Sequence, residues 1–232
     1  MIYRHWCDVL PRAVEVVPVE MPGRGSRPEE PPYKSLAPLI ERLTEAIDPL
    51  LDKPYAFFGH SMGALVAFEL ACSIRERSNR EPLALFVSGR RAPQVPDDKP
   101  LTYSLPDPQF IDELRRLQGT PEEVLEHDEL MELLLPLLRA DFQIVQTYEY
   151  LPRKALRCPI SVYGGLSDSC ETRDRLLAWA QHTSVNLVLH MLPGDHFFLR
   201  SSQSLLLEML ARELLEVITR SEVLASRTTS SA

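Results

Sequence analysis

Three side chains in this 232-residue chain have the types and the order that serine-based hydrolysis needs, and Ser61 is the first of them. It lies in a G-x-S-x-G pattern from Gly59 to Gly63, after an apolar stretch and before an Ala- and Leu-rich one. This context predicts a serine at the apex of a tight turn between a strand and a helix. We expect neither flanking glycine to tolerate a side chain there. The helix N-terminus behind Ser61 favours an anion that forms at its hydroxyl.

Asp168 and His196 are the candidates for the other two roles. A serine nucleophile needs a base to take its proton and an acid to orient that base, and with this kind of turn they follow in the order Ser, Asp or Glu, His. Both residues follow apolar runs, at 160–163 and 185–191, so we expect them at the carboxyl edge of a parallel sheet. Asp168 could instead be a turn or cap residue. Asp195 is an alternative orienting acid, but neighbours in sequence rarely point the right way, so we favour Asp168. We expect His60 to stand behind the nucleophile without a direct role.

The elements that must position these residues follow from the hydrophobic pattern. Strands are predicted at 14–19, 55–59, 83–88, 160–163 and 185–191, and helices at 36–51, 62–77, 106–117, 122–150, 173–181 and 203–219. This alternation is typical of a mainly parallel sheet with helices on both faces, so we expect a single α/β domain over 1–232. A helical insertion at 100–155 is a candidate lid, and 220–232 is expected to be a disordered tail.

Composition excludes several classes of function. With 25 Lys and Arg against 33 Asp and Glu, the net charge is −8, which argues against a nucleic-acid partner. No apolar run is long enough for a membrane span or a signal peptide, so we expect a soluble, cytoplasmic protein without a membrane partner. The cysteines have no C-x-x-C pair and no histidine at ligand spacing, so neither a disulfide framework nor a metal site is expected. The four cysteines are Cys7, Cys72, Cys158 and Cys170.

Six motifs, taken together and in order, resemble the type II thioesterases. These are stand-alone α/β-hydrolases of polyketide synthase and nonribosomal peptide synthetase systems, similar to the medium-chain thioesterase of animal fatty acid biosynthesis. The likeness runs from about Tyr3 to Leu215. The motifs are P-G-R-G at 22–25, G-H-S-M-G-A at 59–64, L-R-A-D at 138–141, C-P-I at 158–160, G-G-L-S-D at 164–168 and P-G-D-H-F-F at 193–198.

The resemblance implies a specific reaction. Ser61 would be the nucleophile, His196 the general base and Asp168 the orienting acid, while the backbone N–H of Met62 would stabilise the oxyanion. The substrate would be an acyl thioester on the phosphopantetheine arm of an acyl carrier protein or peptidyl carrier domain, hydrolysed for editing or release. Residues 100–155 would form a mobile lid over the acyl channel. No metal or organic cofactor is implied, and we expect a monomer.

The start of the chain departs from the family pattern. Type II thioesterases resemble one another in opening with an apolar strand and a His-Ala-Gly-Gly-like turn, which supplies a second oxyanion donor ahead of a helix with a Tyr-Arg-x-Trp stretch. Here Tyr3-Arg4-His5-Trp6 already corresponds to that helix. We therefore expect an N-terminally truncated fold that is poorly stable and weakly active. A start codon assigned downstream of the true one, a truncated isoform and a true loss of catalysis are the three explanations.

Two other functions remain open on the residues alone. An esterase or lipase for oxygen esters would share the fold and the three residues, because function is a property of the site and not of the fold. A non-catalytic binder of acyl groups or carrier proteins would fit the missing oxyanion loop. A basic cluster of Arg153, Lys154 and Arg157 is either a docking point for an acidic carrier protein or an ordinary solvated turn.

Overall fold

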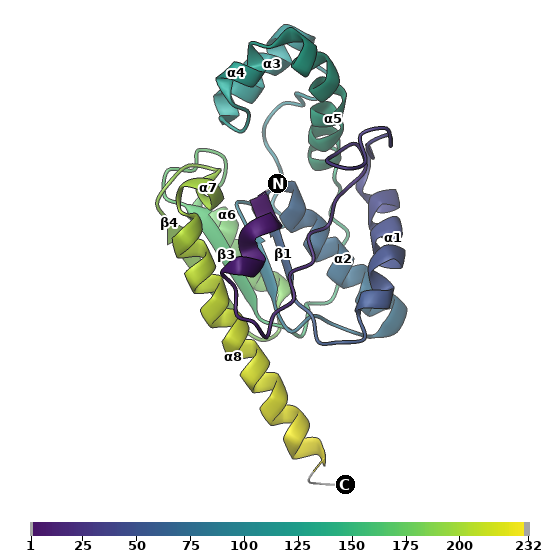
Figure 1. Ribbon diagram of the computed structural model, residues 1–232, viewed down its shortest axis with the longest axis vertical. Coiled ribbons are helices and arrows are strands. Elements are labelled where there is room, and N and C mark those ends of the chain that lie inside the picture. Colours follow the sequence, from purple (N-terminus) through teal and green to yellow (C-terminus); the bar gives the residue numbers. More distant parts are fainter. Residues whose placement is uncertain (1, 230–232) are drawn as a thin grey trace.

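A four-stranded, all-parallel sheet in the order β1-β2-β3-β4 forms the centre of the computed structural model, which describes residues 2–229 (Figure 1). Its register aligns Phe57 with Leu85, Leu85 with Ile160 and Ile160 with Leu187. β2 and β3 are buried along their whole length, as expected of parallel strands covered on both faces. The strands are β1 (Phe57–His60), β2 (Leu85–Ser88), β3 (Ile160–Gly165) and β4 (Leu187–Leu192).

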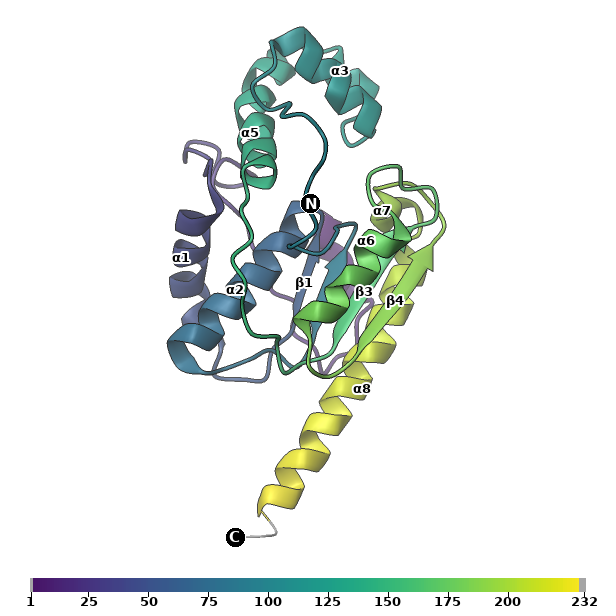
Figure 2. The same cartoon turned by 180° about the vertical axis from the view of Figure 1, so that it is seen from behind.

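Helices cover the two faces of this sheet. The crossovers β1–β2 and β3–β4 both step the same way along the sheet, so right-handed connections place their helices on one face. That face carries α2 (Met62–Ser78), α6 (Arg173–Leu177) and η3 (Ala178–His182), as Figure 2 shows. α1 (Leu36–Ile47), followed by the short η2 (Asp48–Leu50), packs against α2. The opposite face is covered by η1 (Ile2–Asp8), α7 (Phe198–Ser201) and α8 (Gln203–Thr229).

The alternation of strand side chains explains why two cores form. Leu85 and Val87 point to the α2 side, where they meet Phe68 and Trp179. Phe86, on the same strand, points to the other side and packs with α7 and α8. Period-two alternation along one strand therefore supplies both layers with apolar surface.

A helical insertion between β2 and β3 lies above the carboxyl edge of the sheet (Figures 1 and 2). Its helices are α3 (Asp107–Leu117), α4 (Glu122–Leu125) and α5 (Asp128–Gln146), within the predicted range 100–155. The helix predicted at 122–150 is broken, because His127 accepts a hydrogen bond from the Leu130 N–H and starts a new helix. The mobility of this insertion stays a prediction.

The strand predicted at 14–19 does not form. This stretch is extended but unpaired, and Val17 and Val19 are more than half exposed. A strand needs a hydrogen-bonded neighbour, and a cavity of about 1780 Å³ reaches from this stretch to β1. Extended backbone without a ladder is not a strand, which is why apolar alternation gave the wrong prediction here.

β1 therefore has a free outer edge within the described residues. The N–H groups of Phe57 and Ser61 donate to the carbonyls of Ala84 and Ser88, on the β2 side, at 3.3 and 2.8 Å. Successive residues of a strand present their backbone groups to opposite edges, so those of Phe58 face away from β2.

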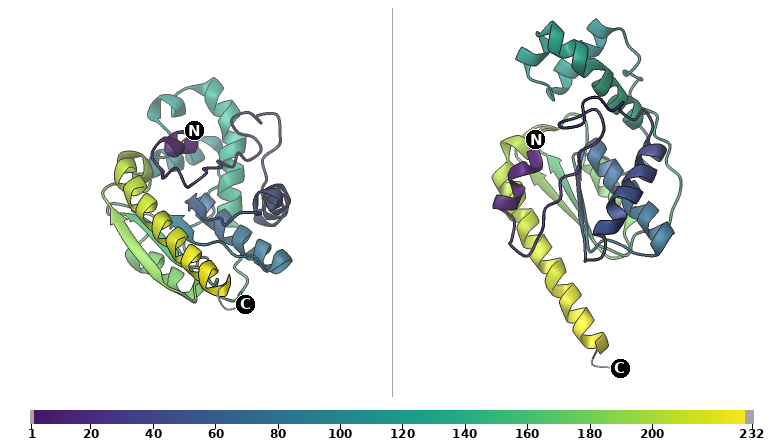
Figure 3. Two further views of the ribbon diagram at one scale, coloured as in Figure 1. Left: turned by 60° about the horizontal axis from the view of Figure 1, so that its bottom comes forward. Right: turned by 45° about the vertical axis from the view of Figure 1, so that its right-hand side comes forward.

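Both ends of the described chain are helical, and only the C-terminal one differs from expectation. The first turn is a 3₁₀-helix, η1, whose Trp6 is buried against Phe58. At the other end, 220–229 continue α8 instead of fraying, because residues such as Leu, Glu and Ala favour helix and neither Gly nor Pro interrupts them. α8 extends well past the sheet (Figure 3). The expected tail beyond 229 lies outside the described residues.

In the described part of the chain no helix combines the length and apolar character that a bilayer span requires.

Candidate active site

Ser61 occupies the sharp turn between β1 and α2. Its backbone has φ 53° and ψ −117°, a conformation that a residue with a side chain rarely adopts. A Cβ on Gly59 would lie 2.0 Å from the carbonyl oxygen of Gly63, so glycine is required there. The same expectation for Gly63 was wrong. A Cβ on Gly63 would meet nothing within 4 Å, because it would point into open space.

The structure brings the three predicted side chains together. The Nε2 atom of His196 lies 3.1 Å from the Oγ atom of Ser61, and its Nδ1 atom lies 2.9 Å from Oδ2 of Asp168. The three residues follow β1, β3 and β4, so the parallel sheet gathers them at its carboxyl edge. This geometry allows His196 to accept the hydroxyl proton on one side while it donates to a carboxylate on the other.

Backbone groups hold Asp168 in place. Its Oδ1 atom accepts hydrogen bonds from the N–H groups of Cys170 and Glu171, at 2.7 and 3.2 Å. Burial acts to raise the pKa of Asp168, but the hydrogen bond with His196 and these two N–H groups bring the pKa below its ordinary value. Asp195, the alternative acid, accepts from the N–H of Phe197 instead. The structure thus places Asp168, and not Asp195, on the imidazole.

His60 packs directly behind the site. Its ring centroid lies 5.2 Å from that of His196, and its Nδ1 atom is 2.9 Å from the hydroxyl oxygen of Ser88. Burial, and secondarily the neighbouring His196, lower the pKa of His60 to about 3. His60 is therefore neutral near pH 7 and adds no charge beside the nucleophile.

A buried ion pair that the sequence analysis missed stands behind Asp168. The guanidinium of Arg91 lies 3.2 Å from Glu171 and 2.7 Å from Asp97, and both Arg91 and Glu171 are almost fully buried. The N–H of Glu171 donates to the Asp168 carboxylate, so this ion pair contacts Asp168 only indirectly, through Glu171. The available signal was two consecutive charged residues, 90 and 91, one residue after a strand that is fully buried.

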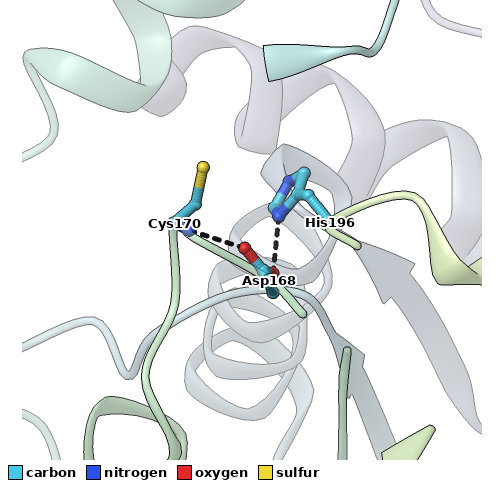
Figure 4. A group of neighbouring side chains, drawn as sticks. All are labelled: Asp168, Cys170 and His196. Carbon is cyan, nitrogen blue, oxygen red and sulfur yellow. Dashed lines mark hydrogen bonds and ion pairs between the residues drawn. The ribbon is translucent and has the colours of Figure 1, made fainter. Parts of the chain in front are cut away.

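Cys170 is a further neighbour of the site (Figure 4). One ligand atom from each of Asp168, Cys170 and His196 lies within 4.8 Å of the others, although sequence spacing gave no hint of such a group. Zinc favours this donor set. However, Asp168 and His196 already satisfy each other at 2.9 Å, so metal binding would break that hydrogen bond.

Met62 is the first residue of α2 and follows the nucleophile directly. The N–H groups in the first turn of a helix have no partner within the helix, so that of Met62 is available to an anion beside Ser61. Residues 2–56 contain no strand, so no loop after an earlier strand supplies a second donor in the described chain.

The cavity of about 1780 Å³ beside β1 also contains Ser61 and His196. It extends under α5, where Leu138 and Phe142 line it.

The basic cluster proposed for docking is largely neutralised. Arg153 pairs with Glu69 and Glu76 at 3.0 and 3.2 Å, and Arg157 pairs with Glu81 at 3.2 Å. These contacts tie the segment before β3 to α2 and the loop after it, which favours the solvated-turn interpretation of the cluster.

A parallel sheet that presents a linked serine, histidine and aspartate at its carboxyl edge defines the class: a serine hydrolase of the α/β-hydrolase fold. Within this class the assignment is narrower, because the thioesterase domain model matches residues 1–214. The chain belongs to the thioesterase family.

Individual proteins support this membership. The gramicidin S biosynthesis protein GrsT of Aneurinibacillus migulanus is 45% identical over 212 residues, which are 91% of this chain and 83% of that protein. The solved structure of RedJ, the thioesterase of the prodiginine biosynthetic pathway in Streptomyces coelicolor, matches with a TM-score of 0.85 and 38% identity, over 91% of this chain and 84% of its own. YbtT, a type II thioesterase of the yersiniabactin NRPS/PKS pathway, matches with a TM-score of 0.78 and 30% identity, over 93% and 88%. The resemblance to type II thioesterases is confirmed.

Proposed function

We propose that Ser61, His196 and Asp168 hydrolyse acyl thioesters carried on the phosphopantetheine arm of a carrier protein. The observation that carries this proposal is the position of His196, whose two ring nitrogens lie 3.1 Å from the Ser61 hydroxyl and 2.9 Å from the Asp168 carboxylate. A thioester suits such a site because a thiolate is a good leaving group. Type II thioesterase activity is also the activity of the family.

The reaction has two steps. In the first, the Ser61 oxygen attacks the thioester carbonyl while its proton moves to Nε2 of His196. The carbon–sulfur bond then breaks, the thiol takes that proton, and the acyl group stays on Ser61 as an ester. In the second step water attacks this ester and gives its proton to His196, which returns it to the serine oxygen as the acid leaves.

Asp168 and Met62 stabilise the charges that develop. Asp168 stays ionised because its pKa is lowered, so it fixes the tautomer of His196 and stabilises the imidazolium. The N–H of Met62 and the N-terminal end of α2 face the oxyanion. The positive imidazolium thus lies next to a carboxylate, and the negative oxyanion lies next to a backbone N–H donor.

The substrate and partner follow from the cavity and the family. Apolar side chains of the insertion, including Leu138, Phe142 and Val145, line the cavity and can hold an acyl chain. The size of this cavity, about 1780 Å³, gives room for the acyl group and part of the long arm of an acyl carrier protein or a peptidyl carrier domain. We infer a cytoplasmic location, because every cysteine is a free thiol in the described residues.

Two variants test this function. Ser61→Ala should abolish hydrolysis of an acyl-pantetheine thioester while leaving the unfolding transition in place, since only a hydroxyl is lost. Asp168→Asn should lower kcat by about 10⁴-fold, because the wrong tautomer of His196 is then held. Hydrolysis of carrier-bound thioesters should exceed that of p-nitrophenyl esters in kcat/KM. Full activity of Ser61→Ala would refute the mechanism, and a preference for the aryl ester would identify an esterase.

A further inference from the structure

Asp168, Cys170 and His196 form a group of side chains that offers chemistry beyond hydrolysis (Figure 4). One ligand atom from each residue lies within 4.8 Å of the others, and all three residues are half-buried. Cys170 is a free thiol. The hydrolytic reaction uses Asp168 and His196 but gives this thiol no role. An oxygen, a sulfur and a nitrogen donor therefore meet at one place.

The loop after β3 holds the donors of Asp168 and Cys170 together. Oδ1 of Asp168 accepts hydrogen bonds from the N–H groups of Cys170 and Glu171 at 2.7 and 3.2 Å, which fold this loop around the carboxylate. The other oxygen, Oδ2, faces His196 at 2.9 Å. One oxygen is thus anchored by the backbone while the other is free to turn to a metal ion. Hydrogen bonds of this kind orient the carboxylates that bind metals in proteins.

The spacing of the three donors is close to that of a zinc site. Zinc–sulfur and zinc–nitrogen bonds of about 2.3 and 2.0 Å, at tetrahedral angles, place neighbouring donors about 3.3–3.6 Å apart. The donors here lie no more than 4.8 Å apart, and the imidazole and carboxylate of His196 and Asp168 are 2.9 Å apart. Movements of about 1 Å by these side chains bring all three donors to one ion.

The donor types select the metal. Mg²⁺ and Ca²⁺ take oxygen ligands, whereas a thiolate with an imidazole and a carboxylate suits Zn²⁺. Three protein ligands leave the fourth position of the tetrahedron to water. Cys170 and His196 both line the cavity that contains Ser61, so an ion can reach them from it.

Zinc at this place would remove the general base. If zinc binds Nδ1 of His196, the ring proton moves to Nε2, which then faces Ser61 as a donor. If zinc binds Nε2, it occupies the lone pair that accepts the serine proton. In both cases Ser61 keeps its proton. Burial raises the pKa of the Cys170 thiol, so its proton leaves to water as the zinc–sulfur bond forms. The hydrogen bond between Asp168 and His196 is lost, and three bonds to zinc replace it.

We propose that Asp168, Cys170 and His196 form an inhibitory zinc site. The ion binds reversibly between the two loops that follow β3 and β4, and it holds the hydrolase inactive until the metal is removed. The inhibition rests on the proposed function, whereas the binding of zinc does not. The two can therefore be measured separately.

Titration of the metal-free protein with Co²⁺, followed by Zn²⁺, tests binding. Co²⁺ bound to a thiolate gives a charge-transfer band in the near ultraviolet, and Zn²⁺ should abolish this band by displacement. We expect the band in the wild type, Ser61→Ala and Cys7→Ser, but not in Cys170→Ser. Cys7 is the matched control, because it is an exposed thiol whose sulfur lies 3.7 Å from a carboxylate oxygen of Asp8. Urea unfolding checks that each variant is folded.

Release of the free acid from an acyl-pantetheine thioester tests inhibition. Each rate is compared with that of the same variant in EDTA. Zn²⁺ should inhibit the wild type and Cys7→Ser, and Mg²⁺ should inhibit neither. In Cys170→Ser the inhibition constant for Zn²⁺ should rise by at least about 10- to 100-fold, because a direct ligand contributes no less to affinity than an outer hydrogen-bond partner.

Three results would overturn the zinc site as an inhibitor. Equal inhibition of the wild type and Cys170→Ser would show that zinc acts at His196 without the thiol. Absence of the cobalt band in the wild type would show that the three donors do not close on an ion. A band that depends on Cys170 without any inhibition by Zn²⁺ would show binding that leaves the base free.

The proposed function stands or fails separately in the same experiments. A wild-type protein that hydrolyses no thioester but shows the Cys170-dependent band would keep the metal site and remove the reaction. Normal hydrolysis without the band would keep the reaction and remove the metal site.

Discussion

Mild acid should destabilise this protein through His182, a histidine buried far along the sheet from the active site. His182 is 3% exposed, its Nε2 atom donates to the Gln94 amide oxygen at 2.5 Å, and its ring packs edge-on against Phe68 and Trp179. Burial lowers the pKa of His182 to about 4. At pH 5 the native protein thus keeps this imidazole neutral, whereas a histidine exposed to water would be protonated.

The size and sign of the effect follow from proton linkage. Between pH 6.5 and about 4 the unfolded chain binds a proton at His182 that the native protein does not, so stability falls as the pH falls through this window. At pH 5, which is about 1.5 units below the ordinary pKa of a histidine, His182 is almost fully protonated in the unfolded chain and mostly neutral in the native protein. This corresponds to about 2 kcal/mol of lost stability from one side chain.

Urea unfolding at pH 7.5 and pH 5 measures this loss. His182→Gln keeps a donor for Gln94 but does not titrate, so its free energy of unfolding should fall by about 2 kcal/mol less than that of the wild-type protein. Other groups, including His60, titrate equally in both and cancel in the difference. His5→Gln, at an exposed histidine, should behave as the wild type. Equal losses in the wild type and His182→Gln would refute the reasoning.

Two further predictions concern backbone space and buried charge. Gly59→Ala should fold poorly or unfold at a clearly lower Tm than Gly63→Ala, because only the first would bring a Cβ to 2.0 Å from a carbonyl oxygen; equal Tm values would contradict the turn geometry. Arg91→Met should lose about 3–5 kcal/mol in urea unfolding, because it leaves Glu171 buried without its partner. A double variant with Glu171→Leu should recover part of this loss, and no recovery would argue against the ion pair as the cause.

The sequence predicted a feature correctly where neighbouring residues determine that feature, and failed where distant residues do. The turn at Ser61 was predictable because its pattern is contained in a few neighbouring residues. Asp168 and His196 were predictable because each follows a strand of the parallel sheet. The segment 14–19 was not, since pairing depends on a neighbour that its own pattern does not contain. The Arg91–Glu171 ion pair was missed because burial, and not residue type, distinguishes it from a pair on the surface.

The unpaired outer edge of β1 can form backbone hydrogen bonds with another chain. Backbone donors and acceptors at Phe58, flanked by a large apolar cavity, form a template on which any extended peptide can be added as a further strand. Two molecules can use this template on each other, so self-association should grow steeply as the protein is concentrated. The amides along this edge should also exchange with deuterium sooner than those of β2 and β3, which are bonded on both sides.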